Sequence, residues 1–186
     1  MTATRVLQVP FGGVAAVDDV GPLFAAHAAF LVRVVERLTG SGPLAEDIVQ
    51  EAFLVAHRRR RELCDVPEVR GWLYRVCANN LRQHRRSLWR RFRLLGAMAT
   101  EPEPAQVRLP DDDAARFERG RRIRACIVEL PFELREVLVL FDLEGESTRG
   151  VAELLGIPEG TVSSRLARAR AQFRERWCAL EDGAAP

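Results

Sequence analysis

The chain has 186 residues, of which 47% are apolar, so it is long enough and apolar enough to form one packed domain or two small ones. Its net charge is only +2, yet all 28 positive side chains are arginines, clustered between acidic stretches. This composition excludes a disordered tail, and no apolar run reaches the ~20 residues that a membrane-spanning helix needs.

The four cysteines and the start of the chain indicate the compartment. Cys64, Cys77, Cys126 and Cys178 lie far apart, with no CxxC motif and no histidine at metal-ligand spacing. The tail of residues 1–20 does not resemble a signal peptide, because its short apolar run is broken by proline and glycine. We therefore expect a cytoplasmic protein with reduced cysteines and with neither metal nor cofactor.

A first helical module is predicted for residues 21–93. Apolar residues recur at helical spacing from Leu23 to Leu38 and stop before Gly40, a natural helix terminator. A second helix is expected from about Pro43 to Arg60, and a third from Pro67 to about Trp89.

The helical pattern fails over residues 94–113, where three prolines and three consecutive aspartates predict a flexible linker. A second module follows over residues 114–182, with one helix through Ile123 and Ile127 and another entered through Pro131. A short helix before Gly156 and a final helix from near Pro158 complete it. No stretch alternates like a strand, so we predict an all-α protein of two small helical domains, the C-terminal one a helix-turn-helix domain.

The last helix has the composition of a DNA recognition helix. Val162, Leu166, Phe173 and Trp177 are expected to face inward, whereas short side chains and arginines, Arg170 among them, face outward. The alternative is an ordinary solvated helix face, but the preceding glycine turn favours DNA binding. The residues expected at the DNA are Thr161, Ser163, Ser164, Arg165, Ala167 and Arg168.

The third helix of the first module is strongly basic, since residues 69–100 include no acidic side chain. Arginines there attract phosphates, and interleaved aromatic and amide groups can stack on or hydrogen-bond to exposed bases. For Trp72 a place in the core is favoured over a base contact, because Leu73 and Val76 flank it on an apolar face. The candidate residues are Trp72, Tyr74, Arg75, Asn79, Arg82, His84, Arg85 and Arg86.

Two blocks of the sequence resemble the extracytoplasmic function (ECF) subfamily of bacterial sigma-70 factors, which start transcription. The C-terminal module of that family is similar to LPFELREVLVLFDLEGESTRGVAELLGIPEGTVSSRLARAR, of which GIPEGTVSSRLARAR is the most specific part. Its polymerase-binding and DNA-melting helices are similar to RLTGSGPLAEDIVQEAFLVAHR and GWLYRVCANNLRQHRR, in the same order. The linker is too short for the additional central domains of housekeeping sigma factors.

The resemblance implies a function without bond-making chemistry. The chain would bind RNA polymerase core enzyme, recognise the −35 element with its last helix and the −10 element with its basic helix, and promote DNA melting. A segment over residues 59–66 would select a captured base, and an anti-sigma factor would control a chain that is otherwise monomeric. The docking stripe for polymerase would be Asp47, Gln50, Glu51 and Leu54, for which an ordinary solvated helix face is the alternative.

Departures from the family limit what the resemblance implies. Gln83 and Ser163 stand where many relatives carry an acidic and a basic residue, and Phe141 stands where some place an arginine that reaches DNA. Helical spacing from Leu134 and Leu138 predicts that Phe141 belongs to the core instead. The promoter sequence therefore cannot be transferred from a relative.

Two other functions compete with this interpretation. A conventional regulator with a helical sensor domain would carry a similar helix-turn-helix but would dimerise on palindromic DNA. A helical enzyme is disfavoured, because His27, His57 and His84 have no obvious acid, nucleophile or metal partner nearby in the sequence.

Overall fold

The computed structural model describes residues 20–63, 66, 68–95 and 111–182, and within these ranges it is helical without any strand, which confirms the all-α prediction. The predicted tail and most of the predicted linker lie outside these residues. No helix within them is long and apolar enough to cross a membrane. In chain order the helices are α1 (Gly21–Thr39), α2 (Gly42–Arg58), α3 (Arg60–Leu63), α4 (Val69–Leu95), α5 (Asp111–Val128), α6 (Phe132–Leu138), η1 (Val139–Leu143), α7 (Thr148–Leu155) and α8 (Glu159–Asp182).

The first module is built from α1, α2 and α4. Helix α1 ends where predicted, at Gly40, whose φ of 76° lies in the left-handed region that glycine adopts without strain. Helix α2 begins at Ser41, whose hydroxyl accepts a hydrogen bond from the backbone N–H of Leu44 at 3.4 Å. The short helix α3 was not predicted, and its Leu63 is buried in the core.

The second module contains the predicted helix-turn-helix. Helix α7 begins at Ser147, which caps the N–H of Gly150 at 3.0 Å, and ends at Gly156, whose φ is 68°. Helix α8 follows directly. Helix α6 begins after Pro131, as expected. It continues into the π-helical turn η1, which apolar spacing did not predict. This turn places Val139 and Leu140 in the core.

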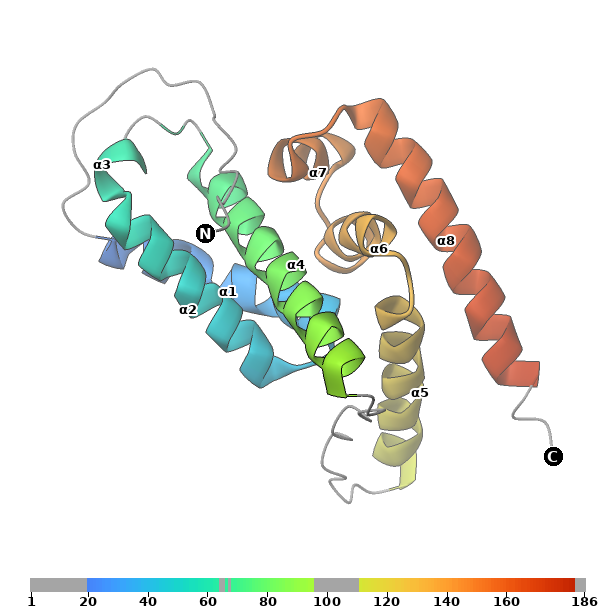
Figure 1. Cartoon of the computed structure of the whole chain (residues 1–186). Helices are drawn as coiled ribbons and strands as arrows, with labels where there is room; N and C mark the ends of the chain where they lie inside the picture. Colours follow the sequence, from blue (N-terminus) through green and yellow to red (C-terminus); the bar gives the residue numbers. More distant parts are fainter. Residues whose placement is uncertain (1–19, 64–65, 67, 96–110, 183–186) are drawn as a thin grey trace.

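The two modules pack against each other, which the sequence analysis did not predict. In Figure 1, α4 lies between the helices α1 and α2 on one side and α6 and α7 on the other. Helix α4 contacts α7, and α1 contacts both α5 and η1. The buried side chains of both modules form one continuous apolar core.

A buried arginine on α6, Arg135, forms hydrogen bonds with backbone atoms of both modules. Arg135 is 4% exposed, and its guanidinium donates hydrogen bonds to the backbone oxygens of Leu38 at 2.6 Å, Leu130 at 2.9 Å and Val128. Leu38 lies in the last turn of α1, and the other two carbonyls lie at and just beyond the end of α5. These are carbonyls that helix ends leave without intrahelical partners, so Arg135 stabilises two helix C-termini at once.

Replacing this arginine is therefore expected to destabilise the whole chain. Arg135→Met keeps much of the side-chain volume but leaves buried carbonyls unpaired, and it should lower the free energy of unfolding by about 3 kcal/mol. Arg58→Met, at an exposed position on α2, should change it by less than about 0.5 kcal/mol. Urea denaturation followed by circular dichroism measures both, and equal effects would show that the buried hydrogen bonds contribute nothing.

Candidate nucleic-acid interface

The N-terminal half of α8 separates apolar from polar side chains as predicted. Val162 and Ala169 are fully buried and Leu166 is 8% exposed, so this side of the helix packs on the module. The opposite side forms an outward face with two half-buried members, Thr161 and Arg165, and four exposed ones, Ser163, Ser164, Ala167 and Arg168.

The two serines of this face remain able to bind a ligand. The Ser163 hydroxyl donates to the backbone oxygen of Glu159 at 3.1 Å, and the Ser164 hydroxyl donates to that of Thr161 at 3.0 Å. Each hydroxyl uses its proton inside the helix, but its oxygen keeps lone pairs that can accept from a base amino group. With Ala167 between them and Arg168, the face allows close backbone approach to a groove.

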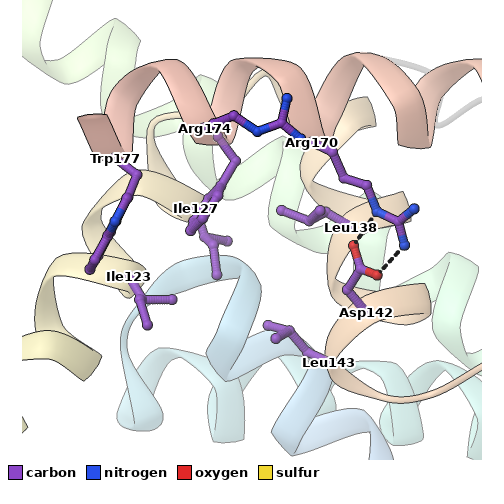
Figure 2. Close-up of a pocket in the computed structure, with 9 residues that line it drawn as sticks. Ile123, Ile127, Leu138, Asp142, Leu143, Arg170, Arg174 and Trp177 are labelled. Atoms are coloured by element: carbon purple, nitrogen blue, oxygen red, sulfur yellow. Dashed lines mark hydrogen bonds and ion pairs between the residues drawn. The ribbon is translucent and has the colours of Figure 1, made fainter. Parts of the chain in front are cut away.

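Arg170 turns away from this face toward η1, as Figure 2 shows. Its guanidinium donates to both carboxylate oxygens of Asp142, at 2.5 and 3.0 Å, and lies 5.4 Å from the centre of the Phe141 ring. The hydrogen bonds to Asp142 raise the pKa of Arg170. Phe141 itself is partly buried and packs against the core, as its spacing predicted.

An apolar pocket of about 330 Å³ opens beside this ion pair. The Asp142–Arg170 pair lies at one end of it and Trp177 with Ile123 at the other (Figure 2). The Phe173 and Trp177 rings, predicted to face inward, stack with centroids 6.4 Å apart. Such a pocket can receive apolar side chains. Its lining is Ile123, Ile127, Leu138, Asp142, Leu143, Arg170, Phe173, Arg174 and Trp177.

The predicted docking stripe lies on the outer side of α2. Asp47, Gln50 and Glu51 are exposed, and Leu54 keeps 50% of its surface in solvent. Phe24 of α1, which helical spacing did not single out, is also 52% exposed, and the centre of its ring lies 4.9 Å from that of Phe53 on α2. The stripe therefore joins carboxylates to exposed apolar surface, a combination suited to a protein partner.

The residues expected at the −10 element are divided between different sides of α4. Asn79, Arg85 and Arg86 are exposed, and His84 is half-buried. Trp72 is partly buried and packs against the core, as the core interpretation of this residue predicted.

The expected surface position of Tyr74 is wrong, because its side chain is fully buried in the core. Its hydroxyl donates a hydrogen bond to Oε1 of Glu136 on α6 at 3.0 Å. Burial raises the pKa of Tyr74 well above its ordinary value, and the neighbouring Glu136 carboxylate raises it further. The phenol therefore stays protonated and acts as a donor between the modules.

Two of the expected DNA-binding arginines are engaged by the second module. Arg82 donates to Oε2 of Glu136 at 2.9 Å, and its guanidinium lies 4.8 Å from the centre of the Phe132 ring. Arg75 donates to the backbone oxygens of Glu153 at 3.1 Å and Leu154 at 3.2 Å, near the end of α7. Burial raises the pKa of Glu136, although the charge of Arg82 opposes this effect.

Acidic side chains of the second module meet the basic helix α4, and helical spacing did not predict these contacts. Glu136 is 2% exposed and binds Arg82, and Glu146 forms an ion pair with Arg70 at 2.7 Å, whereas Glu144 pairs with Arg37 of α1 at 3.0 Å. The signal that could have found them is charge complementarity, because acidic residues recur over 129–146 while 69–100 has none.

The cysteines show no arrangement for chemistry in the described part of the chain. Burial raises the pKa of Cys77 to about 12 and also raises that of Cys126, so both remain protonated thiols. Cys178 is exposed, and Cys64 lies outside the described residues. Within those residues, no three potential metal ligands lie together.

Comparison with known proteins gives two family matches, one in each half of the chain. Residues 23–91 match Sigma-70 region 2, and residues 120–173 match Sigma-70, region 4. The chain is 37% identical over 145 residues to the ECF RNA polymerase sigma factor SigL of Mycobacterium tuberculosis, covering 77% of this chain and 80% of that protein.

Two further likenesses concern a longer relative and a solved structure. The probable RNA polymerase sigma factor RfaY of Xanthomonas campestris is 30% identical over 191 residues, and the match covers 96% of this chain but only 46% of that protein. The fold is similar to that of the sigma factor RpoE from Bartonella quintana, solved with the anti-sigma factor NepR, at 22% identity and a TM-score of 0.65, covering 87% of this chain and 98% of that one. The two region matches and the shared identity with SigL show that this chain belongs to the ECF sigma factors of the sigma-70 family.

Proposed function

We propose that this chain binds RNA polymerase core enzyme, recognises the −35 and −10 promoter elements and promotes DNA melting. The observation that carries the proposal is the outward face of α8, the second helix of the helix-turn-helix. This face presents short side chains and arginines to solvent, while the opposite side of the helix is apolar and buried. The chain forms no bond itself in this function, since polymerase supplies the chemistry.

The α8 face is the proposed reader of the −35 element. Arg165 and Arg168 can make bidentate contacts to guanine or contact phosphates, and the serine oxygens can accept from base amino groups. The contact residues are Thr161, Ser163, Ser164, Arg165, Ala167 and Arg168.

Helix α4 is the proposed site for the −10 element. Opening a duplex costs a few kcal/mol per unstacked base, and stacking on an aromatic side chain returns about 1–3 kcal/mol. Tyr74 is buried, so it would hold α4 in place by packing in the core and would not contact a base. The proposed contacts are Trp72, Arg75, Asn79, Arg82, His84, Arg85 and Arg86.

The docking stripe of α2 is the proposed contact to core polymerase. We propose an anti-sigma factor in the cytoplasm as a second protein partner of the chain. The stripe is exposed and acidic at Asp47 and Glu51 and apolar at Leu54, which favours a basic partner surface with an apolar centre. The likeness to a sigma factor solved with an anti-sigma factor supports the second partner at the level of the fold. Outside such complexes we propose that the chain is a monomer.

Transcription in vitro tests the function as a whole. Core enzyme mixed with the purified chain and genomic promoter fragments should give run-off transcripts that neither component gives alone. A conventional regulator would instead form a dimer on palindromic DNA and initiate nothing with core enzyme. Absence of any transcript across fragments that contain its own promoter would overturn the proposal.

Loss of the α8 contacts should weaken use of the −35 element. Replacing Ser164 and Arg168 by alanine removes a hydroxyl that can accept a hydrogen bond and a charged guanidinium. Transcription from a −35-dependent promoter should therefore fall about tenfold or more. Affinity for core enzyme should not change. Arg124→Ala, an exposed arginine on α5, removes the same charge and should leave transcription nearly unchanged. A parallel loss of core affinity would contradict the assigned roles.

Charge reversal on α2 should impair assembly with polymerase. Asp47→Arg places a cation in the acidic stripe and should weaken binding to core enzyme about tenfold or more, measured by competition with another sigma factor. Glu36→Arg makes the same change at an exposed site on α1 and serves as the control. Unchanged competition by the Asp47→Arg chain would remove α2 from the docking surface.

A further inference from the structure

We propose that Asp142 and Arg170 are positioning residues, whose ion pair fixes the rotation of α8 about its own axis and so aims the outward face of this helix at the bases of the −35 element. This inference rests on the proposed reading of that element by α8. Arg170 acts in it through the neighbouring side chains of the face and does not contact DNA itself.

Arg170 lies at the edge of the outward face of α8. It follows exposed Ser163 by seven residues and buried Leu166 by four, spacings that place residues on the same side of a helix. Arg170 is therefore on the border between the DNA-facing side and the apolar side. From there its guanidinium reaches across to η1 (Figure 2).

The turn η1 holds this guanidinium in two ways. The carboxylate of Asp142 accepts hydrogen bonds from it at 2.5 and 3.0 Å, and the centre of the Phe141 ring lies 5.4 Å away. Two hydrogen bonds to one carboxylate fix the direction and the plane of a guanidinium, whereas a point charge does not. The direction in which Arg170 leaves α8 is accordingly set by η1.

The π-helical geometry of η1 brings the carboxylate to this place. The backbone N–H of Glu144 donates to the oxygen of Val139 at 3.0 Å, five residues back, so the turn is wider than an α-helical one. Leu138 and Leu143, also five residues apart, both line the pocket beside α8, together with Asp142. Single π-helical turns occur frequently at functional sites, and this one presents a carboxylate toward α8.

Apolar packing does not set the rotation of α8 as tightly as this pair does. Val162, Leu166 and Ala169 are buried, but apolar contacts are non-directional. A rotation by about 20° moves a side-chain tip about 5–6 Å from the helix axis by roughly 2 Å. Hydrogen bonds to base edges need donor–acceptor distances of roughly 2.7–3.2 Å. Such a rotation would leave the helix packed and yet take Ser164 and Arg168 out of register with the bases.

The exposure of the pair separates positioning from a general structural role. Arg170 keeps 49% of its side-chain surface in solvent and Asp142 keeps 30%. Ion pairs as exposed as this contribute little to stability. Variants of the pair should therefore stay folded, with melting temperatures close to that of the wild-type chain by circular dichroism.

Base preference at the −35 element detects a helix in the wrong rotation. Holoenzyme assembled from core polymerase and the full chain transcribes a set of promoters that differ by single base pairs in this element. With the wild-type chain, a wrong base pair at a read position should lower the transcript yield roughly tenfold. With Asp142→Ala or Arg170→Met it should lower the yield less than about threefold, because the face no longer meets the base edges in register.

The sign of the charge change distinguishes positioning from electrostatics. Asp142→Ala removes a carboxylate beside a DNA-binding helix, so electrostatics alone would strengthen DNA binding. Lost positioning should instead lower transcription from the preferred promoter about fivefold or more. If Arg170 contacted a phosphate, Arg170→Met would lower transcription equally from every promoter and leave the preference intact. The matched control is Arg122→Ala, which loses an exposed ion pair with Glu118 on α5 and should keep the wild-type preference.

A double exchange completes the test. Asp142→Arg with Arg170→Asp rebuilds the pair with reversed polarity and unchanged net charge, so it should restore most of the base preference. Wild-type preference in both single variants, an equal loss at every promoter, or a loss that the double exchange does not restore would each overturn the positioning role. In all three cases transcription by the wild-type chain would still support the proposed function. Absence of wild-type transcripts would count against that function instead, so the two failures are distinguishable.

Discussion

The carboxylate of Glu136 lies where the two modules of this chain meet, and it accepts one hydrogen bond from the buried phenol of Tyr74 and one from Arg82. Burial raises the pKa of this carboxyl, because the surrounding core disfavours the charged form, and the charge of Arg82 opposes that rise. The apolar residues around it belong to one core shared by both modules. This pairing joins α4 to α6 within the core that the two modules share.

This arrangement gives the arginines of α4 two sets of partners. In the free chain, Arg75 and Arg82 bind carbonyl and carboxylate oxygens of the second module. In the proposed promoter complex, the same side chains bind DNA. By contrast, Asp47, Gln50 and Glu51 on α2 and Ser163, Ser164, Ala167 and Arg168 on α8 are exposed in the packed structure.

Helical spacing predicted the main helices because each of them buries one apolar side, and Gly40 and Gly156 end α1 and α7 where expected. The outward face of α8 was predicted correctly for the same reason. Tyr74 was misplaced because a basic neighbourhood suggested a surface, whereas its ring fills the core and only its hydroxyl meets a charge. Periodicity within one helix carries no information about which distant helix it will meet. The contacts of α4 with Glu136, Glu146 and the end of α7 therefore could not be read from spacing.

The most direct test of the account is the separation of the modules before and after promoter binding. Spin labels at exposed Cys178 on α8 and at Glu36→Cys on α1, with Cys64 replaced by serine, report this separation by pulsed electron resonance. We expect one short distance distribution in the free chain, consistent with the packed structure, and a longer one in the complex with core polymerase and promoter DNA. An unchanged distribution in an active complex would contradict the account, because Arg75 and Arg82 would then still be bound to the second module and not to DNA.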